Sequence, residues 1–191
     1  MKSERVIEIF REAGALLEGH FLYASGRHGR QFLQAARVCQ YPKHTEALCR
    51  AMAHRFASDR VDLVVGPATG AIVLAYETAR HLNCRAAYTD KDDAGGMALK
   101  RGFALESGCR VLVVEDITTT GGSIKKSIAH LRNRGAEVVG VGVLIDRSAG
   151  EAAFDCGFEP LATLDMESWP PEDCPLCREG ITLIDPDHLV V

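Results

Sequence analysis

Two hydrophobic periods alternate along the chain, and their order predicts the fold. Residues 3–13 carry apolar side chains at helical spacing, among them Val6 and Phe10, and Gly14 is a suitable stop for a short helix. From Val61 onward, short apolar runs typical of buried strands alternate with amphipathic helices. Because this alternation builds doubly wound sheets, we expect an α/β fold whose central, mostly parallel sheet is flanked by helices.

The individual elements follow from the positions of apolar runs, prolines and glycines. Pro42 is expected to begin a helix that runs to about Ala57, and a second helix is expected to follow Gly70 and end near His81. Four apolar runs predict the strands of the central sheet, at residues 61–65, 84–88, 111–115 and 137–145.

Two segments are predicted to project from this sheet. Strands at 19–24 and 31–36 flank a polar, basic turn over 25–29, which is the pattern of a hairpin. Residues 89–96 are too polar and glycine-rich to be buried, and the strand-like run 97–105 follows them. We therefore expect a mobile loop within a second hairpin.

Length and charge narrow the class of protein. With 191 residues, 47% of them hydrophobic, the chain can fill one core and is short for two, so we expect a single domain over 1–191. A net charge of −4 with mixed signs lacks the basic stripe of a nucleic-acid surface. The apolar runs are shorter than the roughly 20 residues of a membrane span, and the chain begins with an amphipathic segment rather than a signal peptide. We expect a soluble, cytoplasmic protein.

The seven cysteines are an odd number scattered over predicted helices and strands, which favours a reducing compartment. Cys174 and Cys177 form a C-x-x-C pair, half of the spacing of a zinc site. No second C-x-x-C or H-x-x-x-H follows, and His188 alone would leave such a site short of ligands. We therefore favour a structural or incidental role for the pair over metal binding.

The segment 111–123 combines a buried strand, two adjacent carboxylates and a glycine loop rich in hydroxyls. Glu115 and Asp116 follow the strand, at the edge where α/β sheets bind ligands. Residues 121–123 would open a helix whose first N–H groups favour an anion, above all phosphate. The alternatives are an ordinary turn between strand and helix, and the acidic strand of a Walker-type NTPase. The second is excluded because the chain has no G-x-x-x-x-G-K-[ST] loop.

This segment resembles the 5-phosphoribosyl 1-diphosphate (PRPP) motif of the type I phosphoribosyltransferases. Over nearly its whole length the chain is similar to the orotate phosphoribosyltransferases, through collinear segments at 19–21, 25–28, 40–42, 66–68, Lys91, 146–147 and 174–177. Purine-specific relatives lack the N-terminal Ser-Gly-Arg turn. The resemblance implies transfer of the phosphoribosyl group from PRPP to N1 of orotate, which gives orotidine 5′-phosphate and pyrophosphate with Mg²⁺ in pyrimidine biosynthesis.

The resemblance also divides the chain and assigns its site residues. Residues 1–40 would form an N-terminal helix and a small hood, 60–148 the PRPP-binding core, and 89–97 a flexible catalytic loop. A homodimer is implied, because the loop lysine of the family reaches the neighbouring active site. PRPP would be bound by Glu115, Asp116, Ile117, Thr118, Thr119, Thr120, Gly121, Gly122, Ser123, Pro67, Ala68, Thr69, Gly70 and Lys91.

Roles follow from the chemistry of the transfer. Breaking the anomeric bond builds positive charge on the ribose and negative charge on pyrophosphate, so catalysis is mostly electrostatic. Glu115, Asp116 and Lys91 are the expected catalytic residues. Mg²⁺ is expected to be held mainly by substrate oxygens and water, with no metal ligand from the protein.

Thr119 and Arg147 are the expected orotate contacts, because a planar guanidinium pairs bidentately with a carboxylate. Each assignment has a plainer alternative. Arg147 could form a salt bridge with Asp146, Lys91 could be a solvated surface lysine, and residues 67–70 could be a simple tight turn.

Three cations typical of enterobacterial-type members are missing, where this chain has Ala24, Gly70 and Asp90. Either Arg27, Lys100 or Arg101 supplies the positive charge, or the base preference has changed. Two other functions stay open: phosphoribosyl transfer to another nucleobase, and a non-catalytic regulator that senses PRPP. The regulator would need a DNA-binding module, and neither an extra domain nor a basic stripe is visible.

Overall fold

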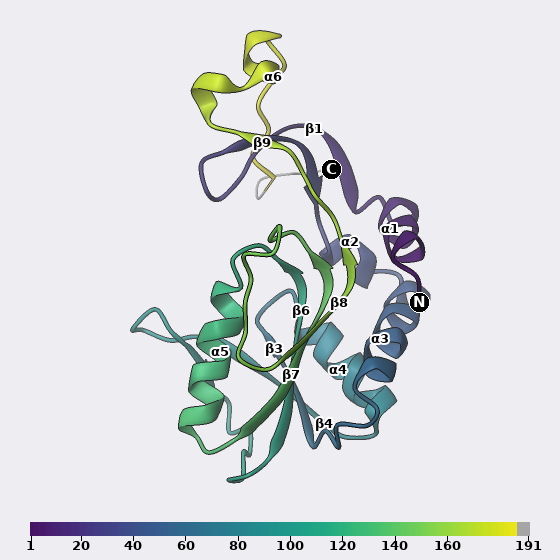
Figure 1. Ribbon diagram of the computed structural model, residues 1–191, viewed down its shortest axis with the longest axis vertical. Coiled ribbons are helices and arrows are strands. Elements are labelled where there is room, and N and C mark those ends of the chain that lie inside the picture. The colour runs from purple at the N-terminus through teal and green to yellow at the C-terminus, as the bar shows by residue number, and fades with distance from the viewer. Residues whose placement is uncertain (187–191) are drawn as a thin grey trace.

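The computed structural model describes residues 1–186, which form a large sheet covered by helices and a small sheet beside it (Figure 1). The large sheet has the order β5-β4-β3-β6-β7-β8. Five of its strands are parallel, and β5 is antiparallel to β4 at one edge. Its strands are β3 (Leu63–Pro67), β4 (Arg85–Lys91), β5 (Met97–Leu99), β6 (Arg110–Thr118), β7 (Glu137–Asp146) and β8 (Gly157–Thr163). The expected α/β class with a mostly parallel sheet is confirmed.

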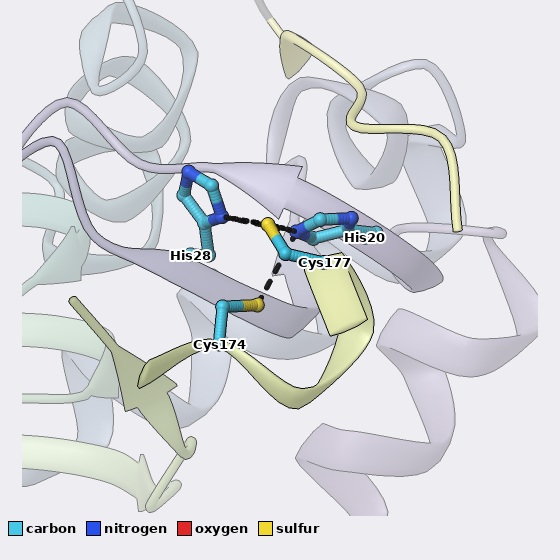
Figure 2. A group of neighbouring side chains, drawn as sticks. All are labelled: His20, His28, Cys174 and Cys177. Atoms are coloured by element: carbon cyan, nitrogen blue, oxygen red, sulfur yellow. Dashed lines mark hydrogen bonds between the residues drawn. The ribbon is translucent and has the colours of Figure 1, made fainter. Parts of the chain in front are cut away.

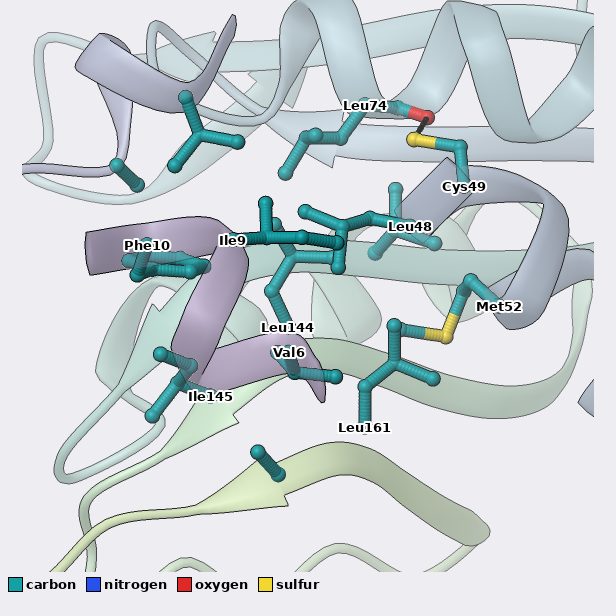
Figure 3. Packing of buried hydrophobic residues seen from close by; sticks show 14 of the residues in the cluster. Val6, Ile9, Phe10, Leu48, Cys49, Met52, Leu74, Leu144, Ile145 and Leu161 are labelled. Atoms are coloured by element: carbon teal, nitrogen blue, oxygen red, sulfur yellow. Dashed lines mark hydrogen bonds between the residues drawn. The ribbon is translucent and has the colours of Figure 1, made fainter. Parts of the chain in front are cut away.

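Helices cover both faces of this sheet and form two hydrophobic layers (Figure 1). On one face, α1 (Ser3–Glu12) packs on β8, α3 (Pro42–Arg55) on β7 and β8, and α4 (Ile72–Leu82) on β3, β4 and β6. Their buried residues form one cluster with Leu112 and Val114 of β6, and Figure 3 shows part of this cluster around Leu48 and Leu144. On the other face, α5 (Gly122–Asn133) packs on Val111 and Val113. The four apolar residues of β6 are thus buried alternately on the two faces, as an uninterrupted apolar run predicts.

The small sheet is the N-terminal hood, with the order β1-β2-β9. Its strands are β1 (Leu16–Leu22), β2 (His28–Leu33) and β9 (Ser168–Trp169), all antiparallel to their neighbours. Helix α2 (Ala36–Cys39) leads from the hood to α3, while a 3-10 turn (Pro171–Asp173) and α6 (Pro175–Arg178) lie on its outer side (Figure 1). The hood is therefore built from both the N-terminal and the C-terminal parts of the chain.

The structure corrects several expected boundaries. The hood strands begin about three residues earlier than expected, because the turn is confined to 23–27. The strand expected over 97–105 ends at Leu99, and β6 continues through the acidic pair to Thr118. Strands β8 and β9 have no counterpart in the sequence analysis. β8 contains Pro160 and has mixed burial, so it lacks a clean alternation.

Among residues 1–186, no helix combines the length and apolar character that a membrane span requires. His188 lies outside the described residues.

Candidate functional site

Glu115 and Asp116, the acidic pair, lie near the carboxyl end of β6, which is a central strand of the large sheet. Glu115 is opposite Val143 of β7, and both carboxylates are largely buried. The backbone N–H of Asp116 donates to Glu115 Oε1 at 3.2 Å, and the N–H of Ile117 donates to Asp116 Oδ1 at 2.6 Å. These bonds fix both carboxylates at the carboxyl end of the strand, where parallel sheets bind ligands.

Two adjacent carboxylates in a poorly hydrated place resist ionisation. Burial raises the pKa of Glu115 to about 8, and the negative charge of Asp116 adds to this shift. Burial also raises the pKa of Asp116, against the hydrogen bond from Ile117 that lowers it. The pair therefore favours partners that donate hydrogen bonds or carry positive charge.

A loop rich in hydroxyls and backbone amides follows the pair. Gly121 has φ of +72° and precedes the first residue of α5, and a Cβ there would lie 2.8 Å from the ring of Phe154. Only glycine fits this turn. Residues 117–124 line a pocket of about 320 Å³ together with Glu115, Lys91 and Lys126. The N–H groups at the start of α5 and two lysines give this pocket the character of an anion site.

A second pocket lies between this loop and the hood. It has a volume of about 610 Å³, and Thr119 and Thr120 line it as well as the first pocket. From the hood it is lined by Tyr23, Ala24, Ser25, Arg27 and Phe32, and from the other side by Arg147, Ser148, Asp165 and Met166. The two predicted orotate contacts, Thr119 and Arg147, thus lie in one pocket.

Arg147 lies in the second pocket and has no ionic partner within residues 1–186. Its backbone N–H donates to Thr118 O at 2.8 Å, and its guanidinium lies 5.2 Å from the centre of the Tyr23 ring. Its Nε is buried and has no hydrogen-bond acceptor among the described residues. Arg147 and Asp146, both among the described residues, do not form the salt bridge that was the alternative interpretation. Asp146 Oδ1 instead accepts from Ser148 N–H at 2.8 Å.

The segment 67–70 joins β3 to α4 and closes over the acidic pair. Ala68 N–H donates to Thr89 O at 2.7 Å, and the peptide between Ala68 and Thr69 is cis. A Cβ at Gly70 would lie 2.5 Å from Asp116 Oδ2. Gly70 therefore lies directly against Asp116, and a larger side chain at position 70 would have to displace this carboxylate.

Lys91 ends β4, and residues 92–96 form the turn between β4 and β5. Four residues of the segment 89–97 therefore lie in paired strands, and the other five form the tip. Lys126 Nζ on α5 donates to Gly95 O at 2.6 Å, and Lys100 Nζ donates to Lys91 O at 2.6 Å. In this conformation the tip rests on α5, and Lys91 lines the first pocket of its own chain.

Comparison with known proteins agrees with this geometry. Residues 40–157 match the phosphoribosyl transferase domain family. The chain is 46% identical over 186 residues to an orotate phosphoribosyltransferase of Caldicellulosiruptor bescii, an alignment that covers 97% of each chain. It is also 46% identical over 178 residues to one of Thermus thermophilus, with 93% of this chain and 97% of the relative covered. The chain belongs to the orotate phosphoribosyltransferase family.

A solved structure supports the same assignment. The crystal structure of orotate phosphoribosyltransferase from Aeropyrum pernix matches with a TM-score of 0.70 and 29% identity, over 83% of this chain and 93% of that one. The type I fold expected from the sequence is thus confirmed by both sequence and architecture.

Among the pocket residues that the sequence did not predict are Lys126 and Tyr23. Lys126 is one of several polar residues on an amphipathic helix, and only its position one turn after Gly122 hinted at the pocket. Tyr23 lies in an apolar run, and the sequence pattern alone does not distinguish it from a core residue. Its hydroxyl donates to Gln31 O at 2.6 Å while its ring faces Arg147.

The raised pKa of Glu115 predicts how stability depends on pH. The folded protein keeps a proton on Glu115 up to about pH 8, whereas the unfolded chain releases it near the usual value of 4.5. The free energy of unfolding therefore falls as pH rises through this window. We expect Glu115→Gln to remove at least about 1.4 kcal/mol of this loss, the equivalent of one pKa unit. Urea unfolding at pH 5 and pH 8 measures it.

Glu4→Gln, at an exposed carboxylate in the first turn of α1, is the matched control and should keep the pH dependence of the wild type. If Glu115→Gln and the wild type lose the same stability between the two pH values, Glu115 is ionised throughout.

Proposed function

We propose that this protein is an orotate phosphoribosyltransferase, which transfers the 5-phosphoribosyl group from PRPP to N1 of orotate in pyrimidine biosynthesis. The observation that carries the proposal is the pair of pockets that share Thr119 and Thr120. One pocket has the donors for a sugar phosphate, and the other holds Arg147, whose buried Nε has no acceptor among the described residues and suits a planar anion. The names of relatives at 46% identity support this choice of base.

In this proposal the first pocket binds the ribose phosphate. The amides and hydroxyls of 118–123 hold the 5′-phosphate, and the carboxylates of Glu115 and Asp116 accept hydrogen bonds from the ribose hydroxyls. Positive charge develops on the sugar as the anomeric bond breaks, and the acidic pair stabilises it. The raised pKa values support this role, because a buried acidic pair gains most from a cationic neighbour.

Pyrophosphate would leave towards 67–70, whose backbone amides adjoin the acidic pair. The site also suits Mg²⁺ held by substrate oxygens and water, since two carboxylates and several hydroxyls can accept hydrogen bonds from the water ligands that this ion keeps. When bound, Mg²⁺ supplies Lewis-acid stabilisation of the pyrophosphate. The chain itself contributes Glu115 and Asp116 beside the sugar and Lys91 as a cation for the leaving group.

Orotate would lie in the second pocket, with its carboxylate on Arg147. The guanidinium is held in place by the Tyr23 ring, so little side-chain entropy is lost on binding. Thr119 reaches both pockets and would contact the base. Ala24 leaves the hood side of this pocket without a lysine, and Arg27 lines the same side. We therefore assign the compensating positive charge to Arg27.

The functional unit would be a homodimer. Tyr41, Val73 and Tyr76 are 45%, 46% and 66% exposed, and Val73 and Tyr76 lie one turn apart on α4. Such an apolar face suits a two-fold interface. Lys91 would then act in the neighbouring site, which requires the tip 92–96 to leave Lys126. Lys100 and Arg101 stay with their own hairpin, where Arg101 pairs with Asp90 at 3.3 Å.

The location of the protein would be the cytoplasm. The seven cysteines are all free, and only Cys174 and Cys177 lie close together in the sequence, which suits a reducing compartment.

A panel of nucleobases tests the activity. Purified protein is incubated with PRPP, Mg²⁺ and orotate, uracil, adenine or hypoxanthine, and pyrophosphate release is followed. We expect release with orotate alone, because only orotate places a carboxylate on Arg147. Release with hypoxanthine and none with orotate would assign another base, and PRPP binding without release from any base would favour a PRPP-sensing regulator.

Replacement of Arg147 tests the base pocket. Arg147→Ala should raise the KM for orotate at least about tenfold more than the KM for PRPP, because a charge-assisted hydrogen bond is worth about 1.5–3 kcal/mol. Steady-state kinetics with each substrate varied gives both constants. Arg50→Ala, on the exposed side of α3, is the control. Equal changes in the two KM values would place orotate elsewhere.

Mixed dimers test the role of Lys91. Lys91→Ala should lower turnover by about 10²-fold or more, as loss of a charge-stabilising group does, with no change in melting temperature. Lys91→Ala mixed with Asp116→Asn should recover about a quarter of wild-type activity, because half of the random dimers contain one intact site. Lys43→Ala is the control. Activity no higher than that of the separate variants would mean that Lys91 serves its own chain.

A further inference from the structure

Two histidines from the hood and two cysteines from the C-terminal region converge on one point (Figure 2). His20 lies in β1, His28 begins β2, Cys174 precedes α6 and Cys177 lies within it. One ligand atom of each side chain lies within 4.8 Å of those of the other three. His20, His28 and Cys174 are buried, and Cys177 is exposed. The cluster lies on the hood, outside the residues that line the two pockets.

The distances between these atoms correspond to the edges of a tetrahedron. His20 Nε2 lies 3.1 Å from His28 Nδ1, 3.4 Å from Cys174 Sγ and 3.7 Å from Cys177 Sγ. His28 Nδ1 lies 3.3 Å from Cys177 Sγ. Zinc bonds of about 2.0–2.1 Å to nitrogen and 2.3 Å to sulfur place tetrahedral ligands about 3.3–3.8 Å apart. The four atoms therefore surround a space of the size that zinc occupies.

A hydrogen bond fixes the orientation of one imidazole. His20 Nδ1 lies 2.8 Å from the carbonyl oxygen of Ile181, which only accepts, so Nδ1 carries the proton. The lone pair of Nε2 in the neutral ring then faces the other three side chains. Histidines that bind metals are oriented in this way, with the second nitrogen donating to a carbonyl or carboxylate.

We propose that His20, His28, Cys174 and Cys177 bind one Zn²⁺ ion in a closed structural site. Two thiolates and two imidazoles are a ligand set typical of structural zinc, and four protein ligands leave no position for a substrate. Binding replaces the thiol protons of Cys174 and Cys177, so two protons are released and the occupied site is neutral. The exposed Cys177 gives the ion a route in.

The sequence analysis favoured no metal here because it looked for ligands that follow Cys177. The histidines precede it by about 150 residues, and the register of the hood brings them together. His20 is also held at the backbone, where Ile184 N–H donates to His20 O at 2.7 Å. The C-terminal segment thus already pairs with β1, and the ion would join the same two segments through their side chains.

The position of the site suggests what it stabilises. Between His20 and His28 lies the turn 23–27, whose residues line the second pocket. Arg27 Nε donates to Ser168 Oγ at 2.9 Å, just before the segment that leads to Cys174. A four-ligand cross-link would hold this turn against the C-terminal segment, in a hood that has only three strands.

Metal analysis of the full chain tests the inference independently of transferase activity. Protein purified without chelators is expected to contain about one zinc per chain by mass spectrometry of the metals. After the zinc is removed under reducing conditions, Co²⁺ should bind with the visible absorption of a tetrahedral thiolate site. Magnesium does not give this spectrum, so the assay separates this site from the catalytic metal.

Variants locate the ion. Cys174→Ser and Cys177→Ser should lose zinc and the cobalt spectrum, while Cys156→Ser, which removes a cysteine remote from the cluster, should keep both. Wild-type protein that lacks zinc and gives no tetrahedral cobalt spectrum would overturn the inference. A wild-type mass lower by two hydrogens, which indicates a disulfide between Cys174 and Cys177, would overturn it as well. Both wild-type measurements decide the question even if the variants fail to fold.

Discussion

Burial of β6 on both faces of the sheet is the constraint on which the site depends. Apolar side chains pack the strand against α5 on one face and against α4 on the other, in a cluster that also includes α1 and α3, so Glu115 and Asp116 follow a rigid base. Burial raises the pKa of both carboxylates, and this electrostatic cost is tolerated because the surrounding layers hold the strand in place. A flexible loop could not keep two such groups side by side.

The loop after β6 lies between the two pockets and contributes residues to both. Gly121 lets the chain enter α5 with its first amides towards one pocket, and Thr119 and Thr120 separate that pocket from the hood. Arg147 follows the neighbouring strand, and its N–H is bonded to Thr118. The two pockets are therefore positioned by two adjacent, hydrogen-bonded strand ends.

Sequence patterns predicted what depends on local chemistry. The apolar run 111–114, the acidic pair and the glycine loop indicated the candidate site, because each of these features acts within a few residues. The cluster at His20 and the cover formed by Gly70 depend on contacts across more than 40 residues, for which one sequence gives no signal. The same applies to β8, an edge strand with a proline and mixed burial, whose pairing with β7 only the assembled sheet reveals.

The hydrogen bond from Lys126 to the Gly95 carbonyl holds the hairpin tip against α5, and a ligand in the first pocket would compete for the same ammonium group. Lys126 lines the first pocket, so an anion that enters this pocket attracts the same ammonium group that holds the tip. A phosphate oxygen that contacted Lys126 would weaken its bond to the Gly95 carbonyl. In the proposed function, arrival of the substrate and release of the tip would thus be coupled through a single side chain, which would link occupancy of the pocket to the freedom of Lys91.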